Sequence, residues 1–204
     1  MAPLRRDAVT RGFLPLLVLS LGLGIGALAW GTDGFRVVTT EGARRLAVLG
    51  DPQPVPAVPL IDQDGRRFSL GDYRGGPVLV EFIYTSCPTL CGVLGDTFAR
   101  LAAAPGPRLL SISFDPERDD PHALQLYGER YGAAPPRWRI AAPADRTGLH
   151  TLLQRFGVVV IPDGQGGFVH NGALYLLDLR GRVSRILDPE APAPVVAAAL
   201  GAAQ

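Results

Sequence analysis

The chain has 204 residues, which fits one ordinary domain of ~100–200 residues with a short appendage, and 47% of them are hydrophobic, enough for a full core. Its formal net charge is +1 and its arginines are scattered rather than gathered into a stripe, which argues against a nucleic-acid partner. No lysine is present, so Schiff-base chemistry and phosphate binding of the Walker type are excluded.

An uncharged, predominantly apolar run covers residues 12–30 and, as a helix, approaches the thickness of a bilayer's hydrocarbon core. Three arginines within residues 1–11 precede it, and the positive-inside rule places this N-terminus in the cytoplasm and the rest of the chain outside. We therefore expect a single transmembrane anchor over residues 12–30. A cleaved signal peptide is the alternative, because residues 27–29 (Ala-Leu-Ala) have the small-x-small pattern of a cleavage site. Both interpretations deliver the domain to the same compartment.

Residues 31–50 are interpreted as a tether that leads into one globular domain over residues 51–204. The prolines of residues 51–59 favour an extended path at the start of this domain. An Asp-Gly turn at residues 62–65 then joins two short alternating runs, which predicts a β-hairpin.

The rest of the domain alternates apolar strands with helical segments. β-Branched and aromatic content predicts strands at residues 77–84, 108–114 and 138–141. Helices are predicted at residues 88–103, 121–131, 145–156 and 192–203, and an antiparallel hairpin at residues 173–178 and 183–187. This order indicates an α/β fold, a mixed sheet covered by helices on both faces.

The two cysteines of the chain, Cys87 and Cys91, follow the first of these strands, at the start of the predicted helix. Residues at this spacing lie on one helical face with Cβ atoms ~5–6 Å apart, near enough to share a metal or to form a disulfide. The helix N-terminus is expected to lower the thiol pKa values and so to supply thiolate, which attacks disulfides and binds metals. A static disulfide is less favoured because so short a loop removes little unfolded-state entropy. The pair therefore indicates redox work, metal binding or both.

Two thiolates do not complete a coordination shell, so metal binding needs a further ligand. His122 and His150, in predicted helices, are expected to be surface residues or residues with satisfied hydrogen bonds rather than metal ligands. His170 lies in a glycine-rich loop before the final hairpin, where loops at strand ends can approach the cysteine segment. A lone loop histidine is also compatible with a plain solvent-exposed residue, and spacing alone does not decide between the two.

Three sequence blocks, downstream of the single anchor, resemble the Sco/SenC family of copper-binding assembly proteins. The blocks are Cys87-Pro-Thr-Leu-Cys91, residues 111–121 (SISFDPERDDP), and His170 ahead of residues 174–181. The resemblance covers residues 50–190 and implies a thioredoxin-like fold with Cys87, Cys91 and His170 as copper ligands. It also implies delivery of copper to, or thiol preparation of, the copper site of cytochrome c oxidase or another extracytoplasmic copper protein. The expected location is a bacterial inner membrane, with one span and the domain in the periplasm.

The chain departs from the family pattern near these ligands. Thr89, Gly92 and Val169 stand where the family usually has Asp, Pro and Asp. The losses change the local charge beside Cys87 and the first turns of the helix, so they bear on the partner surface and on thiol tuning. Asp115 matches the family's Asp-Pro position and is expected to lie near the site and bias its charge.

Two thiolates and an imidazole form a soft, low-coordinate set that suits Cu(I) and can also hold Cu(II), whereas zinc, the second choice, prefers a fourth ligand. The competing hypothesis is an extracytoplasmic thiol–disulfide oxidoreductase, with Cys87 attacking and Cys91 resolving. A peroxidase would need an arginine placed to activate the thiolate, which the sequence does not identify. A tethered scaffold would leave the thiol pair unexplained.

Overall fold

The computed structural model describes residues 7–32, 34, 39–87 and 90–202, and the side chains of residues 7–14 and 90 lie outside this description. The chain divides into two compact units, Met1–Leu46 and Ala47–Gln204. The second unit contains the sheet and the candidate site.

The N-terminal part of the chain is helical. Helix α1 (Asp7–Gly31) contains the predicted span, residues 12–30, the first of whose side chains lie outside the described residues. Taking the described residues alone, we find no helix that is both long enough and apolar enough to cross a membrane. Helix α2 (Thr40–Gly50) occupies part of the predicted tether.

The second unit contains short strands separated by helices, and the predicted elements are present with ends that shift by a few residues. The strands are β1 (Gln53–Pro54), β2 (Pro59–Asp62), β3 (Arg67–Ser69), β4 (Val78–Ile83), β5 (Arg108–Ser113), β6 (Trp138–Pro143), β7 (Val160–Pro162), β8 (Phe168–His170), β9 (Leu174–Leu177) and β10 (Arg182–Leu187). The helices are η1 (Leu70–Tyr73), α3 (Leu90–Ala102), α4 (Pro121–Tyr131), α5 (Arg146–Phe156) and α6 (Ala193–Gly201).

The main sheet is mixed, as the sequence predicts. Its strand order is β1-β10-β9-β4-β5-β6-β2-β3, with β4, β5 and β6 parallel to one another. Strand β9 is antiparallel to β4, and β2 is antiparallel to β6. Because parallel strands end at the same edge of a sheet, the segments that follow β4 and β5 emerge side by side. These segments carry Cys87 and Asp115.

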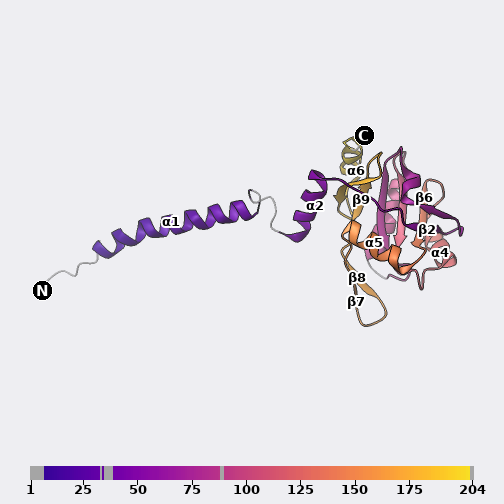
Figure 1. Ribbon diagram of the computed structural model, residues 1–204, viewed down its shortest axis with the longest axis horizontal. Helices are drawn as coiled ribbons and strands as arrows, with labels where there is room; N and C mark the ends of the chain where they lie inside the picture. The colour runs from indigo at the N-terminus through magenta and orange to yellow at the C-terminus, as the bar shows by residue number, and fades with distance from the viewer. Residues whose placement is uncertain (1–6, 33, 35–38, 88–89, 203–204) are drawn as a thin grey trace. The chain divides into compact units, whose positions relative to one another are not determined.

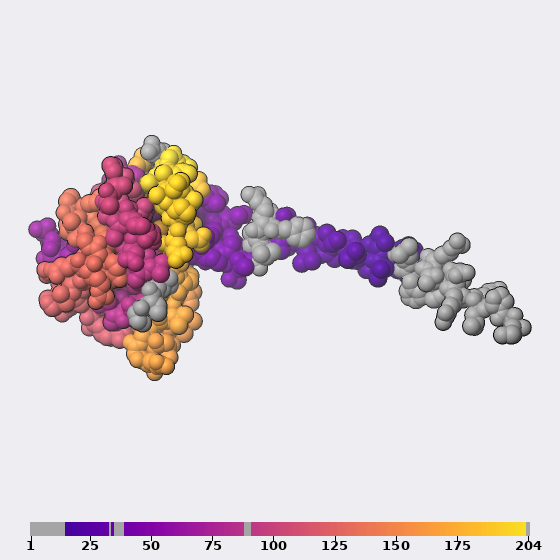
Figure 2. Space-filling view, turned by 180° about the vertical axis from the view of Figure 1, so that it is seen from behind, coloured from indigo at the N-terminus to yellow at the C-terminus, as the bar shows by residue number. Residues whose placement is uncertain are grey.

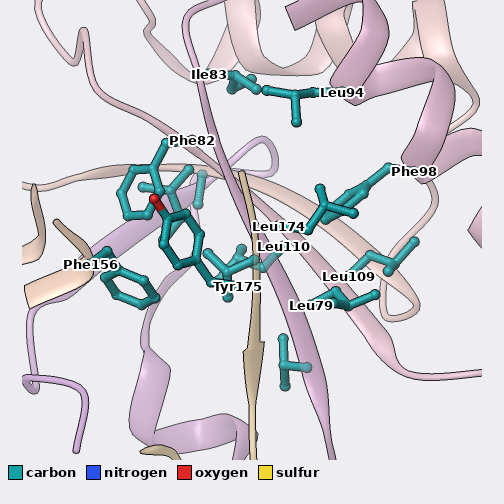
Figure 3. Packing of buried hydrophobic residues seen from close by; sticks show 14 of the residues in the cluster. Leu79, Phe82, Ile83, Leu94, Phe98, Leu109, Leu110, Phe156, Leu174 and Tyr175 are labelled. Carbon is teal, nitrogen blue, oxygen red and sulfur yellow. The ribbon is translucent and has the colours of Figure 1, made fainter. Parts of the chain in front are cut away.

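Strand β4 forms the centre of the core, with all of its residues buried. Phe82 packs edge-on against Phe156 of α5 and Tyr175 of β9, at ring-centroid distances of 5.1 and 5.8 Å. Figure 3 shows this aromatic group apart from Ile83, which lies beside Leu94 of α3. Since successive strand residues point to opposite faces, α3 and α5 cover opposite faces of β4. This double cover explains why the strand is an almost unbroken apolar run.

Strands β7 and β8 form a separate antiparallel hairpin, which projects from the domain in Figures 1 and 2. His170 therefore lies on a strand, which corrects the prediction of a glycine-rich loop at this position. The Asn171 side chain holds the base of the hairpin: its Oδ1 accepts from Val159 N at 2.7 Å and its Nδ2 donates to the Gly157 carbonyl at 3.0 Å. Gly164, Gly166 and Gly167 lie in the turn between the two strands, and Gly172 follows β8.

Candidate metal centre

The cysteine pair lies where β4 is followed by α3. The chain passes from the buried Tyr84 to the half-buried Cys87, and α3 carries Cys91 in its first turn. Neither cysteine forms a disulfide. The backbone N–H of Cys91 donates a hydrogen bond to Cys87 Sγ at 3.3 Å. The pair therefore meets at the beginning of the helix, as its spacing predicts.

Strand β8 brings an imidazole to the buried cysteine. The Nε2 atom of His170 lies 3.8 Å from Cys91 Sγ. The His170 ring packs edge-on against Phe114, which directly follows β5, with 5.0 Å between ring centroids. A sulfur donor and a nitrogen donor that are far apart in the sequence are thus neighbours in the fold.

Burial also sets the protonation of this imidazole. Desolvation lowers the pKa of His170 to about 4, so the ring is neutral at neutral pH. Its Nδ1 atom is buried and has no hydrogen-bond partner in the described part of the chain. A neutral imidazole is the form that binds a metal ion.

The structure corrects the prediction about the thiol pKa values where Cys91 is concerned. This residue is only 1% exposed. Burial, and then its contact with Cys87, raises the pKa of the Cys91 thiol above the ordinary value. The desolvation of a thiolate outweighs the favourable field of the helix N-terminus. Cys91 is therefore a neutral thiol until a metal or a redox partner displaces its proton.

Tyr84 joins the cysteine segment to the hairpin that carries His170. Its hydroxyl accepts a hydrogen bond from the backbone N–H of Phe168 at 3.3 Å and lies 3.4 Å from the Phe168 carbonyl, to which it donates. The two rings pack edge-on at 5.3 Å. Gly167 permits this approach, because a Cβ there would come within 3.2 Å of the Tyr84 hydroxyl and 2.5 Å of Asp163 Oδ2.

Asp119 fixes the other side of the cysteine segment. Its buried carboxylate accepts hydrogen bonds from the backbone N–H and the hydroxyl of Thr85, at 2.9 and 2.6 Å. It also accepts one from the Ser113 hydroxyl at 2.5 Å. Asp119 thereby ties the turn before Cys87 to the end of β5. This aspartate stands in the sequence block of residues 111–121, and no role was predicted for it.

Asp115, expected to bias the charge of the site, forms an ion pair with Arg118. Burial raises the pKa of Asp115, and the Arg118 guanidinium opposes that rise. Arg118 also donates to the Gly166 carbonyl at 2.5 Å and lies over the Phe168 ring at 5.2 Å. Asp115 therefore acts here through Arg118, by supporting the turn of the β7–β8 hairpin.

The remaining histidines are exposed, on α4 (His122) and α5 (His150). Across the described ranges, no group of three or more His, Cys, Asp or Glu side chains is arranged to hold a metal ion. The structure brings Cys91 to His170 and Cys87 to the backbone of Cys91. The ligand set of all three residues stays a prediction.

The donors nevertheless fit a soft metal ion carried as cargo. Metal–sulfur and metal–nitrogen bonds of about 2.3 and 2.0 Å let one ion bridge a sulfur and a nitrogen roughly 3.3–4.3 Å apart. The 3.8 Å between Cys91 Sγ and His170 Nε2 falls within that range. Thiolate sulfur with imidazole nitrogen is a donor combination that suits copper.

A buried carboxyl group lies in the strand before the cysteines. Glu81 is fully buried in β4 and accepts a hydrogen bond from the Ser111 hydroxyl at 2.5 Å; that hydroxyl in turn accepts from Trp138 Nε1 at 2.9 Å. Burial raises the pKa of Glu81 to about 8, against which the Ser111 hydrogen bond acts. The charge of Glu81 also contributes to the raised pKa of Cys91. A single acid within an apolar strand is the sequence signal for this group, and no role was predicted for it.

The fold and the site together define an α/β protein with a thiol pair and an imidazole at the carboxyl edge of its parallel strands. The chain belongs to the SCO1/SenC family, which it matches over residues 53–203. It is 29% identical over 129 residues to the SCO1 protein homolog of Bacillus subtilis, an alignment covering 60% of this chain and 67% of that protein.

Solved structures of Sco proteins share the fold. The copper-bound ScoI of Bradyrhizobium japonicum superimposes with a TM-score of 0.62 at 23% identity, covering 74% of this chain and 99% of ScoI. BsSco, described with a disulfide switch as a member of the Sco family of cytochrome c oxidase assembly proteins, gives a TM-score of 0.60 at 24% identity. That superposition covers 75% of this chain and 95% of BsSco. These likenesses establish the thioredoxin-like Sco fold for residues of the second unit.

Proposed function

We propose that this protein is a copper carrier that holds one copper ion through Cys87, Cys91 and His170. The observation that carries the proposal is the 3.8 Å approach of His170 Nε2 to Cys91 Sγ. Plain thiol–disulfide exchange gives no reason for an imidazole at that position, whereas a soft metal site does. Membership of the SCO1/SenC family and the copper-bound state of the related ScoI support it.

The difference in solvent exposure between the two thiols suits the loading and release of a copper ion. Cys91 is buried and His170 half-buried, while Cys87 is the more accessible sulfur. Each thiol gives up one proton as its sulfur binds Cu(I), so loading releases two protons and leaves the oxidation state of the metal unchanged. A ligand of the acceptor protein can then bind the copper ion beside Cys87 before Cys91 and His170 dissociate from it.

The proposed acceptor is the copper site of cytochrome c oxidase or another extracytoplasmic copper protein. The description of BsSco as a cytochrome c oxidase assembly protein supports the first alternative. We propose that the domain works in the periplasm, attached to the inner membrane through residues 12–30. The arginines that precede this apolar run support that orientation. A mature protein that begins near Trp30 would favour the cleaved signal peptide instead.

Replacing His170 by Ala tests the ligand assignment. The variant should hold Cu(I) about 100-fold more weakly than the parent chain, since one of its donors is lost. A chromophoric Cu(I) chelator in competition with the reduced protein measures this. His150→Ala is the matched control, because His150 is an exposed histidine on α5. Unchanged copper affinity in His170→Ala would contradict the assignment.

The second candidate function is thiol–disulfide exchange, favoured by the contact between the two reduced cysteines. In that reaction Cys87 attacks a target disulfide and Cys91 resolves the mixed disulfide, so two electrons and two protons pass to the target. His170→Ala should leave this chemistry intact, while Cys87→Ser and Cys91→Ser abolish it. If His170→Ala supports oxidase assembly in cells as well as the parent chain does, the oxidoreductase is the better interpretation.

A further inference from the structure

A basic pocket lies at the end of the sheet away from the cysteines. Strand β4 runs from Val78 to Ile83 toward Cys87, a length of about 20 Å at the usual strand rise. Val78 pairs with Leu177 at the far end, directly before the β9–β10 turn. A pocket of about 520 Å³ opens at this turn, lined by residues 178–180, by residues of β10, by Leu49 and Pro52, and by Ala202.

Three guanidinium groups line this pocket: Arg180, Arg182 and Arg185. The carboxylate of Asp178, which also lines the pocket, is engaged in hydrogen bonds within the β9–β10 turn. It accepts hydrogen bonds from the backbone N–H groups of Arg180 and Arg182 at 2.9 Å, and from Arg182 Nε at 2.8 Å. Within the described residues, Arg180 and Arg185 have no acidic partner, so the pocket carries an excess of positive charge.

The rim of the same pocket is apolar. Leu49 is 48% exposed and Leu179 is 36% exposed, so two aliphatic side chains lie beside the arginines. Guanidinium forks match phosphate oxygens in pairs, and exposed leucines gain by contact with hydrocarbon. A ligand that satisfies both features is an anion with an aliphatic part. Free inorganic phosphate satisfies only the first.

We propose that this pocket binds the phosphate head group of an anionic phospholipid, with the arginines on the phosphate and the leucines against its glycerol and acyl end. The inference is independent of the copper assignment. Leu49 and Pro52 belong to the segment that joins the domain to the predicted membrane span. Basic residues beside such a segment favour an anionic bilayer surface. In a domain bound in this way the cysteine edge faces away from the membrane. An acceptor protein can then reach Cys87.

The test uses the full chain in a non-ionic detergent, titrated with dihexanoylphosphatidylglycerol and followed by calorimetry. Parallel titrations use dihexanoylphosphatidylcholine and inorganic phosphate. The variant Arg180→Gln/Arg185→Gln removes the two unpaired charges and keeps the Asp178–Arg182 pair. Arg130→Gln/Arg155→Gln is the matched control, since both residues are exposed, on α4 and α5, and the charge change is identical.

We expect saturable binding of phosphatidylglycerol that weakens about ten-fold in the pocket variant and is unchanged in the control. The proposal is overturned by the absence of saturable binding, by equal binding in the parent chain and the pocket variant, or by equal binding of phosphatidylcholine. If inorganic phosphate binds as tightly as phosphatidylglycerol, the pocket is a free-phosphate site and the lipid assignment is wrong. Copper affinity should not differ among these variants.

Discussion

The His170 Nε2 atom lies 3.8 Å from Cys91 Sγ, although 79 positions separate the two residues in the chain. The hydrogen bonds of two further residues, Tyr84 and Asp119, stabilise this contact. Tyr84 and Asp119 hold the cysteine segment against the hairpin and against the end of β5. Substitutions at Tyr84 and Asp119 therefore change how the site is held while leaving its donor atoms in place.

Tyr84→Phe removes the hydroxyl that bonds to the backbone of Phe168. We expect a loss of about 1 kcal/mol in the free energy of unfolding, since one neutral hydroxyl is deleted. Copper affinity should fall by about ten-fold, less than in His170→Ala, because the donors remain but are held less firmly. Tyr131→Phe is the control, as no hydrogen bond of that half-buried hydroxyl is found among the described residues. Equal copper affinity in Tyr84→Phe and the parent would show that the hairpin is held without this hydroxyl.

Asp119→Ala leaves the donors of Thr85 and Ser113 unpaired. We expect it to cost about 3 kcal/mol in urea unfolding, the scale for removing a buried charged acceptor. The neighbouring Asp120 caps α4 through Ala123 N and is exposed, so Asp120→Ala should cost only about 1 kcal/mol. Equal costs for these adjacent substitutions would contradict the role given to Asp119.

Local sequence patterns were sufficient for most of the fold. The apolar run of β4, broken by Glu81 alone, and the Asp-Gly turn between β2 and β3 are local signals, and both elements formed where predicted. The β7–β8 hairpin was missed because its glycines and Pro162 are typical of a loop. The Asn171 side chain, whose partners are backbone groups of Gly157 and Val159, holds it closed. Those contacts depend on tertiary structure.

In the candidate site, too, local features could be predicted from the sequence and tertiary contacts could not. Spacing placed Cys87 beside Cys91, but only the family resemblance singled out His170. The expected fall in the pKa of Cys91 was wrong because a helix N-terminus is a local feature, whereas burial depends on what packs above it. Tyr84 and Asp119 contact segments far along the chain, so no pattern within either segment could identify them. Glu81 can be recognised in the sequence as an acid in an apolar run, but its burial could not be predicted because it depends on the neighbouring strands of the sheet.

Glu81 gives a prediction about stability and pH. Burial raises the pKa of its carboxyl group to about 8 in the folded chain, from an ordinary value of 4.5. Between these two values the folded state binds more protons than the unfolded state, so stability falls as the pH rises. The contribution of the neutral carboxyl is complete below pH 4.5 and is lost as the pH passes through about 8.

Glu81→Gln removes this titration and keeps the shape of the side chain and an oxygen that can accept from Ser111. Urea unfolding at pH 5, 7 and 9 should therefore show the variant gaining stability relative to the parent as the pH rises, by a few kcal/mol at most. A difference in unfolding free energy that stays constant from pH 5 to pH 9 would mean that the Glu81 carboxyl keeps its ordinary pKa, and that water or another group solvates it within the sheet.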